Sequence, residues 1–220
     1  MTHNHNPFEV FKQACKAACH ERHACTHGYI EMMDAKNIEE VANVWRRYWR
    51  EIVGEMYADV IREEMPHHYL DIKEGFNLAG VYYNECPSSR QTRAFAIVGD
   101  SADAVHVYGY AEVHVIGEAH VVAHDHARVF CSRPQAKIEL LDYAYGEITN
   151  GYGIARNYST LVSTTECESH NASVVTLRGG VLHDYGHYDI KAYNDAVIDS
   201  FTTMRIALFD NAKINIRKKL

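Results

Sequence analysis

The sequence lacks any run of about 18 apolar residues, so it holds no candidate for a transmembrane helix and we expect no membrane association. Its first ten residues, MTHNHNPFEV, lack the basic region and apolar region of a secretory signal. We therefore expect a soluble cytoplasmic protein. In that compartment the six cysteines are expected to be reduced thiols.

A surplus of basic residues is also missing. The chain has 22 Lys and Arg against 29 Asp and Glu, a formal net charge of -7. Proteins that bind nucleic acid depend on basic clusters that meet phosphates, so nucleic acid is not an expected partner. The one basic cluster lies at residues 217–219, within a tail of residues 217–220 that we interpret as solvated.

Several catalytic signatures are absent. The sequence contains no phosphate-binding G-x-x-x-x-G-K-[ST], no G-x-S-x-G nucleophile turn and no H-E-x-x-H zinc motif. No dinucleotide-binding G-x-G-x-x-G follows a strand pattern either. These absences disfavour the nucleotide-dependent and hydrolytic enzymes that carry such motifs.

The N-terminal third has the periodicity of helices. Asn6 and Asn37 are caps, each with a Glu three residues on, and apolar residues follow at three- and four-residue spacing. The first pattern ends near residues 27–28, the second either ends at Gly54 or continues to Pro66, and a shorter helix is expected over about 68–78. We predict a helical domain at residues 1–84 and a linker at 85–94.

An eight-residue repeat fills most of the remaining chain. From Asp103 the sequence reads DAVHVYGY, AEVHVIGE, AHVVAHDH and ARVFCSRP, and a second register begins at Ala172. Between them lies a less regular stretch at about 150–170. The third and fifth positions are mostly β-formers, and the last two positions carry turn residues.

Two architectures fit alternating octads: an antiparallel meander of hairpins, or a β-solenoid in which each octad is one side of a coil. A two-residue hairpin would shift the inward positions from even to odd spacing at every turn, whereas a coil corner preserves the spacing. The even spacing persists through consecutive octads, which favours the solenoid. We predict an α+β fold with a β-solenoid at residues 95–216, at 16 or 24 residues per coil.

One cluster near the N-terminus resembles a set of metal ligands by count, although its spacing fits no strong zinc pattern. The alternative is that Cys15 and Cys19 are core residues of the first helix. Zinc is the one cofactor that the sequence suggests, and no other cofactor is expected. The candidate ligands are Cys15, Cys19, His20, His23, Cys25 and His27.

Histidine and tyrosine are abundant in the repeat, with fifteen of each in the chain. On the solenoid interpretation the histidines lie outward, where they form a metal-binding or pH-sensitive face or else a solvated surface. The tyrosines lie in or beside corners, as a binding surface or as corner packing. The candidate binding residues are His106, His114, His124, His126, Tyr108, Tyr110, Tyr143, Tyr145, Tyr185 and Tyr193.

The octads AEVHVIGE and AHVVAHDH, the ending ALFDNAKINI and the stretch FNLAGVYYNE together resemble small proteins of phages, prophages and mobile elements of gut bacteria. Those proteins join a helical head to octads of the form A-x-V-x-A-x-[GD]-[NSD]. The resemblance spans about residues 8–216 and implies a β-solenoid in a phage or mobile-element setting. It implies no catalytic residue.

Three functions are open on these grounds. The first is a non-enzymatic interaction protein that binds a host protein in the bacterial cytoplasm, as an inhibitor of a host defence system. The second is a virion, tail or scaffold component that forms a homo-oligomer through its solenoid ends. The third is an enzyme or metal-binding protein that uses the His/Asp-rich solenoid face.

Overall fold

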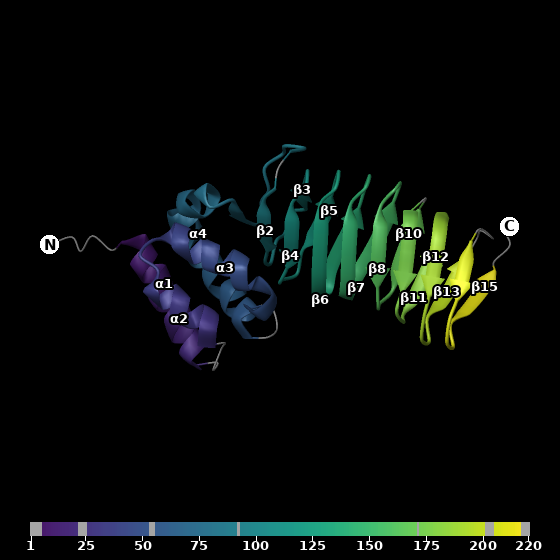
Figure 1. Ribbon diagram of the computed structural model, residues 1–220, viewed down its shortest axis with the longest axis horizontal. Coiled ribbons are helices and arrows are strands. Elements are labelled where there is room, and N and C mark those ends of the chain that lie inside the picture. Colours follow the sequence, from purple (N-terminus) through teal and green to yellow (C-terminus); the bar gives the residue numbers. More distant parts are fainter. Residues whose placement is uncertain are drawn as a thin grey trace. The chain divides into compact units, whose positions relative to one another are not determined.

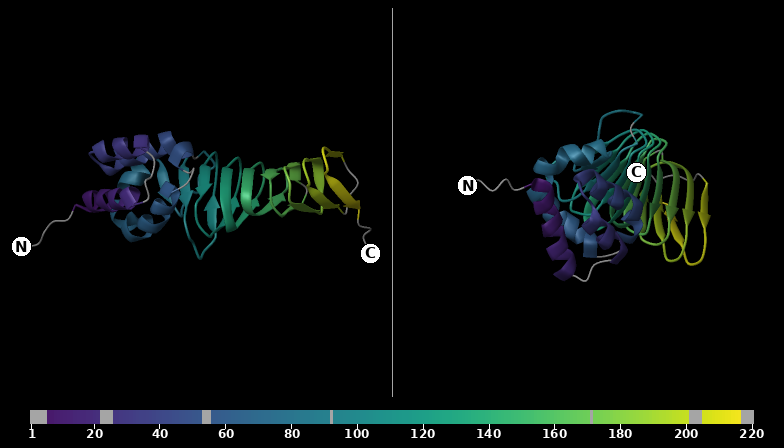
Figure 2. Two further views of the ribbon diagram at one scale, coloured as in Figure 1. Left: turned by 90° about the horizontal axis from the view of Figure 1, so that it is seen from below. Right: turned by 60° about the vertical axis from the view of Figure 1, so that its left-hand side comes forward.

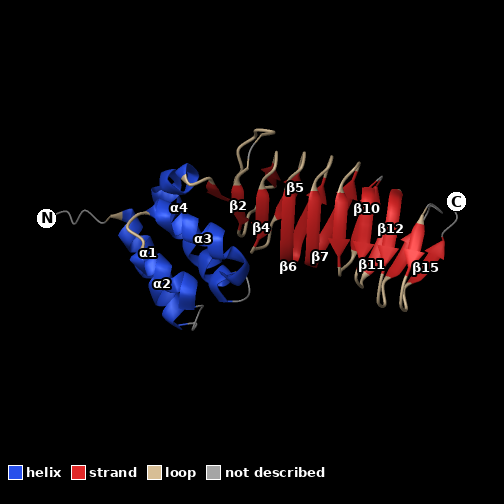
Figure 3. Cartoon of the chain, in the orientation of Figure 1, coloured by secondary structure: helices blue, strands red, loops and turns tan. Residues whose placement is uncertain are grey.

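The computed structural model describes residues 6–21, 26–52, 56–91, 93–170, 172–200 and 205–216 (Figure 1). The chain divides into two compact units, residues 1–83 and residues 84–220. The first is helical and the second is a parallel β-solenoid, so the predicted α+β fold is confirmed (Figure 3). None of the described helices combines the length and the apolar character needed to cross a membrane.

The helical unit begins at the predicted caps. Asn6 Oδ1 accepts the backbone N–H of Phe8 at 3.1 Å, and Asn37 Oδ1 accepts that of Glu40 at 2.9 Å. Each bond satisfies an N–H group that the first turn of a helix leaves without a partner. The helices are α1 Pro7–Glu21, α2 Thr26–Asp34, α3 Ile38–Ile52 and α4 Met56–Leu78, followed by the short strand β1 Val81–Tyr83.

Three aromatic side chains from three helices form the centre of this unit. Phe11, Trp45 and Phe76 are each 0% exposed. The Phe11 ring meets Trp45 edge-on at 5.9 Å between centroids and Phe76 at 6.1 Å. Edge-to-face rings contribute about 0.5–1.5 kcal/mol per pair beyond the area that they bury, so this cluster fixes how the helices pack.

Two helix predictions were wrong. A helix, α2, begins at Thr26, where the sequence predicts an end, because tertiary packing of Met32 and Ala35 stabilises a segment with weak periodicity. The predicted break at Pro66 is absent, and α4 continues through it. Buried Met65 and Tyr69 on either side anchor the helix and offset the hydrogen bond that proline cannot donate.

The solenoid coils through two parallel sheets, and Figure 2 shows its coils stacked one after another. Val105 pairs with Val121 and Glu112 pairs with Arg128, in each case sixteen residues further on. Each coil therefore contains two octads, which decides between the 16- and 24-residue predictions.

The two long strands, β6 Arg128–Leu140 and β7 Tyr145–Arg156, continue through a corner and give one half to each sheet. The other strands of the first sheet are β2 Phe95–Val98, β4 Glu112–Val115, β8 Thr160–Ser163, β10 Ala172–Leu177, β12 His187–Ala192 and β14 Ile206–Leu208. The other strands of the second sheet are β3 Val105–Val107, β5 His120–Ala123, β9 Cys167–His170, β11 Val181–Asp184, β13 Val197–Ser200 and β15 Lys213–Ile216.

The interior between the sheets is thin, and large side chains lie against glycines. A Cβ added to Gly146 would lie 2.6 Å from Leu140 Cδ1, and one added to Gly153 would lie 2.7 Å from Ile148 Cδ1. Leu140 and Ile148 are 0% exposed, so they occupy the space that the glycines leave. Size complementarity between the facing sheets therefore sets the distance between them.

Candidate binding surface along one row of corners

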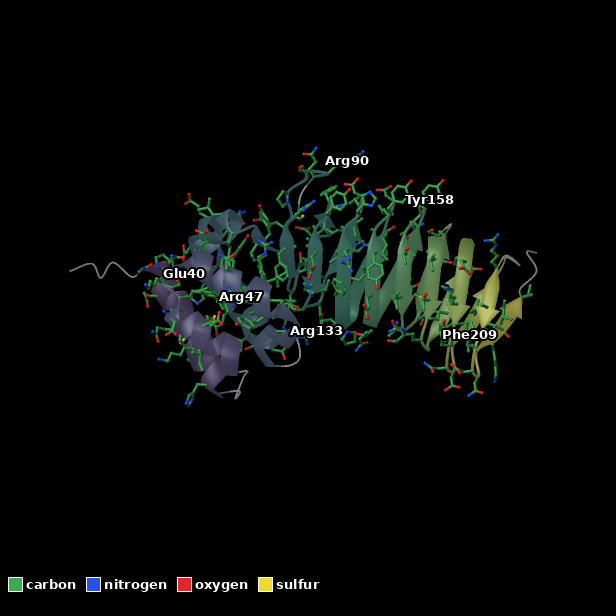
Figure 4. The ribbon with its side chains drawn as sticks, in the orientation of Figure 1. Glu40, Arg47, Arg90, Arg133, Tyr158 and Phe209 are labelled. Carbon is green, nitrogen blue, oxygen red and sulfur yellow. The ribbon has the colours of Figure 1, made fainter. Side chains whose placement is uncertain are left out.

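Every complete coil has two corners, and the corners of successive coils form two rows. One row leads from the second sheet back to the first and is termed here the aromatic corner row; it consists of residues 108–111, 124–127, 141–144, 157–159 and 185–186. The other is termed the opposite corner row. In Figure 4 Tyr158 and Arg90 lie along the upper edge, and Arg133 and Phe209 lie along the lower edge.

The aromatic corner row repeats one local device. A residue with positive φ, between 54° and 67°, is followed directly by an aromatic ring. Glycine, Asp and Asn are the residues that adopt this left-handed conformation at low cost, and they also end the octads in the sequence. The four pairs are Gly109–Tyr110, Asp125–His126, Asp142–Tyr143 and Asn157–Tyr158.

Carboxylates join neighbouring corners of this row. Asp125 Oδ2 accepts the backbone N–H of Gly109 at 3.1 Å, and Asp142 Oδ2 accepts that of Asp125 at 3.3 Å. Each bond crosses from one coil to the next. Successive corners are therefore held at the spacing of neighbouring strands within a sheet, and this fixes the spacing of the rings beside them.

The four rings form a continuous stack along the row. Centroid distances are 5.0 Å from Tyr110 to His126, 5.3 Å from His126 to Tyr143 and 5.5 Å from Tyr143 to Tyr158, with interplanar angles of 16° or less. The three tyrosines are 55%, 59% and 53% exposed. The stack is thus a rigid surface that presents ring edges and phenol groups outward.

A second set of rings lies beside this stack. The His124 ring stacks on Tyr108 at 4.7 Å, and His106 Nδ1 lies 3.1 Å from His124 Nε2. Burial lowers the pKa of His124 below its ordinary value, and the neighbouring His106 lowers it further. One of these two nitrogens donates and the other accepts, so protonation of both rings would break the contact.

The remaining predicted tyrosines lie in three different places. Tyr185 belongs to the aromatic corner row and stacks on His170 at 4.9 Å. Tyr193 lies in the opposite corner row and stacks on Phe209 at 4.7 Å. Tyr145 begins β7 rather than occupying a corner, and the Arg128 guanidinium lies 5.6 Å from its ring centroid.

The predicted outward histidine face was wrong in one respect. Two octads make one coil, so residues eight apart fall on opposite sheets: His106 lies on the second sheet and His114 on the first. His114 is 8% exposed rather than solvated, and it contacts Glu112 at 2.9 Å while stacking on Phe130 at 5.1 Å. His114 therefore contributes to packing and not to a surface shared with His106.

Three residues of these surfaces were not predicted from the sequence. Tyr158 completes the four-ring stack but lies in the irregular stretch, where the octad register is lost. Phe209 and Arg90 were also overlooked, although Phe209 precedes the turn residues Asp210 and Asn211 as Tyr193 precedes Asn194 and Asp195. Tyr193 and Phe209 occupy the same position in their octads, and this could have predicted Phe209 as a corner ring from the sequence.

The outer surface of the second sheet carries a polar network. Glu168 accepts a hydrogen bond from Tyr152 at 2.5 Å and contacts His170 Nε2 at 3.0 Å, while Glu166 lies 3.2 Å from His183 Nε2. The hydrogen bond from Tyr152 lowers the pKa of Glu168, and burial raises the pKa of Tyr152. Tyr152 is thus held as a neutral donor, and Glu168 as an anion.

The candidate zinc ligands lie only partly within the described chain. Cys15 is buried in α1 and His20 is exposed near its end. Residues 22–25, which include His23 and Cys25, and the side chains of Cys19 and His27 lie outside the described residues. Among the side chains that are described, no three of the types that bind metals gather into a group.

Three cysteines of the second unit are protected thiols. Cys86, Cys131 and Cys167 have raised pKa values because burial disfavours the thiolate, and Cys167 is raised to about 12. Only the thiolate is strongly nucleophilic, so these side chains are unsuited to covalent catalysis.

Comparisons of the chain with protein-family models, with curated proteins and with solved structures find no match.

Proposed function

We propose that this chain is a non-enzymatic binding protein that attaches to a protein partner through the aromatic corner row. The observation that carries the proposal is the stack of Tyr110, His126, Tyr143 and Tyr158, in which three tyrosines are more than half exposed. Tyrosine is enriched in protein interfaces, where its two rotatable torsions lose little entropy on binding.

The orientation of the rings favours a protein over a sugar or a nucleobase. Sugars and bases bind aromatic side chains by stacking on the ring face. In this row the two faces of His126 and of Tyr143 are covered by the neighbouring rings, so edges and hydroxyls remain for binding. Those groups suit the polar and backbone atoms of a protein surface.

The resemblance to phage and mobile-element proteins suggests which partner to seek. We propose a host protein of the bacterial cytoplasm, with the chain acting as an inhibitor of a host defence system. A rigid surface supports such a role, because inhibition by surface blocking needs affinity and no chemistry.

The test is affinity capture from a bacterial host, compared between variants. Tyr110→Ala/Tyr143→Ala removes two rings from the stack, and Tyr193→Ala removes one ring from the opposite corner row as a matched control. We expect the wild type and the control to retain one host protein in near-stoichiometric amount at moderate salt, and the double variant to lose it. Equal recovery from all three proteins, with their circular dichroism unchanged, would contradict the proposal.

One observation favours the alternative of a self-associating structural component. In the last described coil, Leu208 is 40% and Ile216 is 60% exposed, whereas their register partners Ala192 and Ser200 are 0% exposed. Among the described strands, β14 and β15 pair on one side only, and apolar residues on such a sheet edge promote edge-to-edge association. Light scattering tests this alternative: a mass that rises with concentration supports it, and a constant monomer mass rejects it.

A further inference from the structure

A pocket of about 380 Å³ lies on the aromatic corner row. It spans three coils, since its walls include Tyr110, His126 and Tyr143 from successive corners. Gly109 stands, without a side chain, at the corner position that Asp125 and Asp142 occupy in the next two coils. The complete lining is Arg90, Tyr110, Asp125, His126, Asp142 and Tyr143.

Two carboxylates in this pocket point to the chemistry of a ligand. Asp125 and Asp142 each use Oδ2 to accept a backbone N–H from a neighbouring corner. At Asp125 the other oxygen already meets a cation, because Oδ1 lies 3.4 Å from Arg90 Nε. The chain's own guanidinium thus shows that an arginine side chain fits beside Asp125.

The contact between Arg90 and Asp125 is easily displaced. The side chain of Arg90 is 88% exposed, and that of Asp125 is 16% exposed. Exposed ion pairs stabilise a structure by about 0.2–1 kcal/mol, because water solvates the charges equally well. A second cation that also buries its aliphatic stem would compete with Arg90 at little cost.

We infer that this pocket receives a cationic side chain, an arginine or a lysine, from the partner protein. The inference rests on the proposed function and names the residue type that the binding surface recognises. The aliphatic stem lies along the edges of Tyr110 and Tyr143, and the charged end pairs with Asp125 and Asp142. The chain's net charge of -7 complements such a partner.

The test is titration of the whole protein with Nα-acetyl-arginine methylamide, followed through backbone amide chemical shifts in NMR spectra. Its lysine counterpart distinguishes guanidinium from ammonium recognition, and the neutral citrulline counterpart is the control for shape alone. We expect the arginine or the lysine probe to shift residues 109–110, 125–126 and 142–143, with dissociation constants on the order of millimolar. The citrulline probe is expected to leave them unshifted.

Three variants locate the effect. Arg90→Gln removes the competing cation and is expected to tighten binding about 1.5- to 5-fold, the range of an exposed ion pair. Asp142→Asn is expected to weaken binding by a similar factor. Asp210→Asn is the matched control, since Asp210 Oδ2 accepts the N–H of Asn194 at 3.1 Å in the opposite corner row; it is expected to change nothing.

The results separate this inference from the proposed function. Each of three results would overturn the cation pocket. These are chemical-shift changes from citrulline equal to those from the cationic probes, no shift changes from either cationic probe, and unchanged binding by Asp142→Asn. The citrulline comparison uses the wild type, so it decides the question even if Asp142→Asn fails to fold. Loss of a captured partner from Tyr110→Ala/Tyr143→Ala would leave the proposed function supported after the pocket had failed.

Discussion

Replacement of Asp184 by valine is expected to destabilise the solenoid by the loss of one buried acceptor. Asp184 belongs to β11, points into the interior and is 0% exposed. Its carboxylate accepts hydrogen bonds from Ser169 Oγ at 2.7 Å, from Ser200 Oγ at 2.5 Å and from the Gly186 N–H at 3.1 Å. Ser169 and Ser200 are its register partners on the coils before and after it.

The expected loss in the free energy of unfolding follows from the hydrogen-bond donors that lose Asp184 as their acceptor. Removal of a buried acceptor costs about 1–3 kcal/mol, and Asp184→Val removes the acceptor of hydrogen bonds from two hydroxyls and one N–H. The hydroxyls can turn toward backbone carbonyls, and removal of a buried charge returns part of its desolvation penalty. We therefore expect a net loss of about 2–4 kcal/mol in the free energy of unfolding.

A compensating variant tests the mechanism. Asp184→Val combined with Ser169→Ala and Ser200→Ala removes the hydroxyls that lost their acceptor and extends the apolar column that includes Leu140 and Ala155. We expect this triple variant to recover at least half of the loss, because replacing all partners by apolar groups is close to neutral.

The assay is urea denaturation followed by far-ultraviolet circular dichroism. Both tryptophans of the chain, Trp45 and Trp49, lie in α3 of the helical unit, so their fluorescence reports that unit separately. The solenoid transition is expected to shift to lower urea while the tryptophan transition stays constant. An unchanged solenoid midpoint in Asp184→Val, or a triple variant less stable than the single one, would refute the reasoning.

Three further predictions concern packing, titration and stacking. Gly146→Val is expected to cost about 1–3 kcal/mol in urea denaturation, because its side chain would overlap Leu140, and Leu140→Ala is expected to restore part of the loss. The pKa of His124 is lower in the folded state than its ordinary value of 6.5, so its contribution to stability is present above pH 6.5 and is lost as the pH falls through the folded pKa. The urea midpoint of His124→Gln is therefore expected to fall less between pH 7.5 and pH 5 than that of the wild type. Tyr143→Ala is expected to lower the free energy of unfolding by about 1 kcal/mol in the same assay, because the ring is 59% exposed and its removal deletes two stacked contacts. A decrease above about 3 kcal/mol would show that the stack is part of the core.

The sequence predicted the solenoid because alternation and corner residues are local properties. It left the number of octads per coil open, since each side of a coil shows the same alternation whether the coil has two sides or three. The coil closes after two octads in a structure where glycines such as Gly146 and Gly153 accept large side chains from the facing sheet. That pairing joins residues of opposite sheets and carries no periodic signal.

The candidate site was predicted in part for the same reason. Corner tyrosines such as Tyr110 and Tyr143 could be recognised from the turn residues beside them. Their stacking partners depend on coil length: Tyr110, His126, Tyr143 and Tyr158 are sixteen, seventeen and fifteen residues apart, and an octad of fixed length does not anticipate that variation. The wrong placement of His114 has the same origin, because the choice of sheet follows from coil closure.

The opposite corner row shows that the corners fold without a continuous row of aromatic rings, although Tyr193 stacks on Phe209 there. Asn194 and Asp210 have the same left-handed backbone there, with φ of 58° and 55°, and are joined by the same carboxylate bond across coils. Corners such as residues 116–119 and 178–180 contain no ring at all. The corner at residues 178–180 turns with left-handed Gly179 and Gly180, and the corner at 116–119 is held by a cross-coil hydrogen bond from the Glu118 N–H to Asp100 Oδ1, so neither corner needs a ring. The four-ring stack exceeds what the fold requires, and that excess is the physical reason to locate binding on the aromatic corner row.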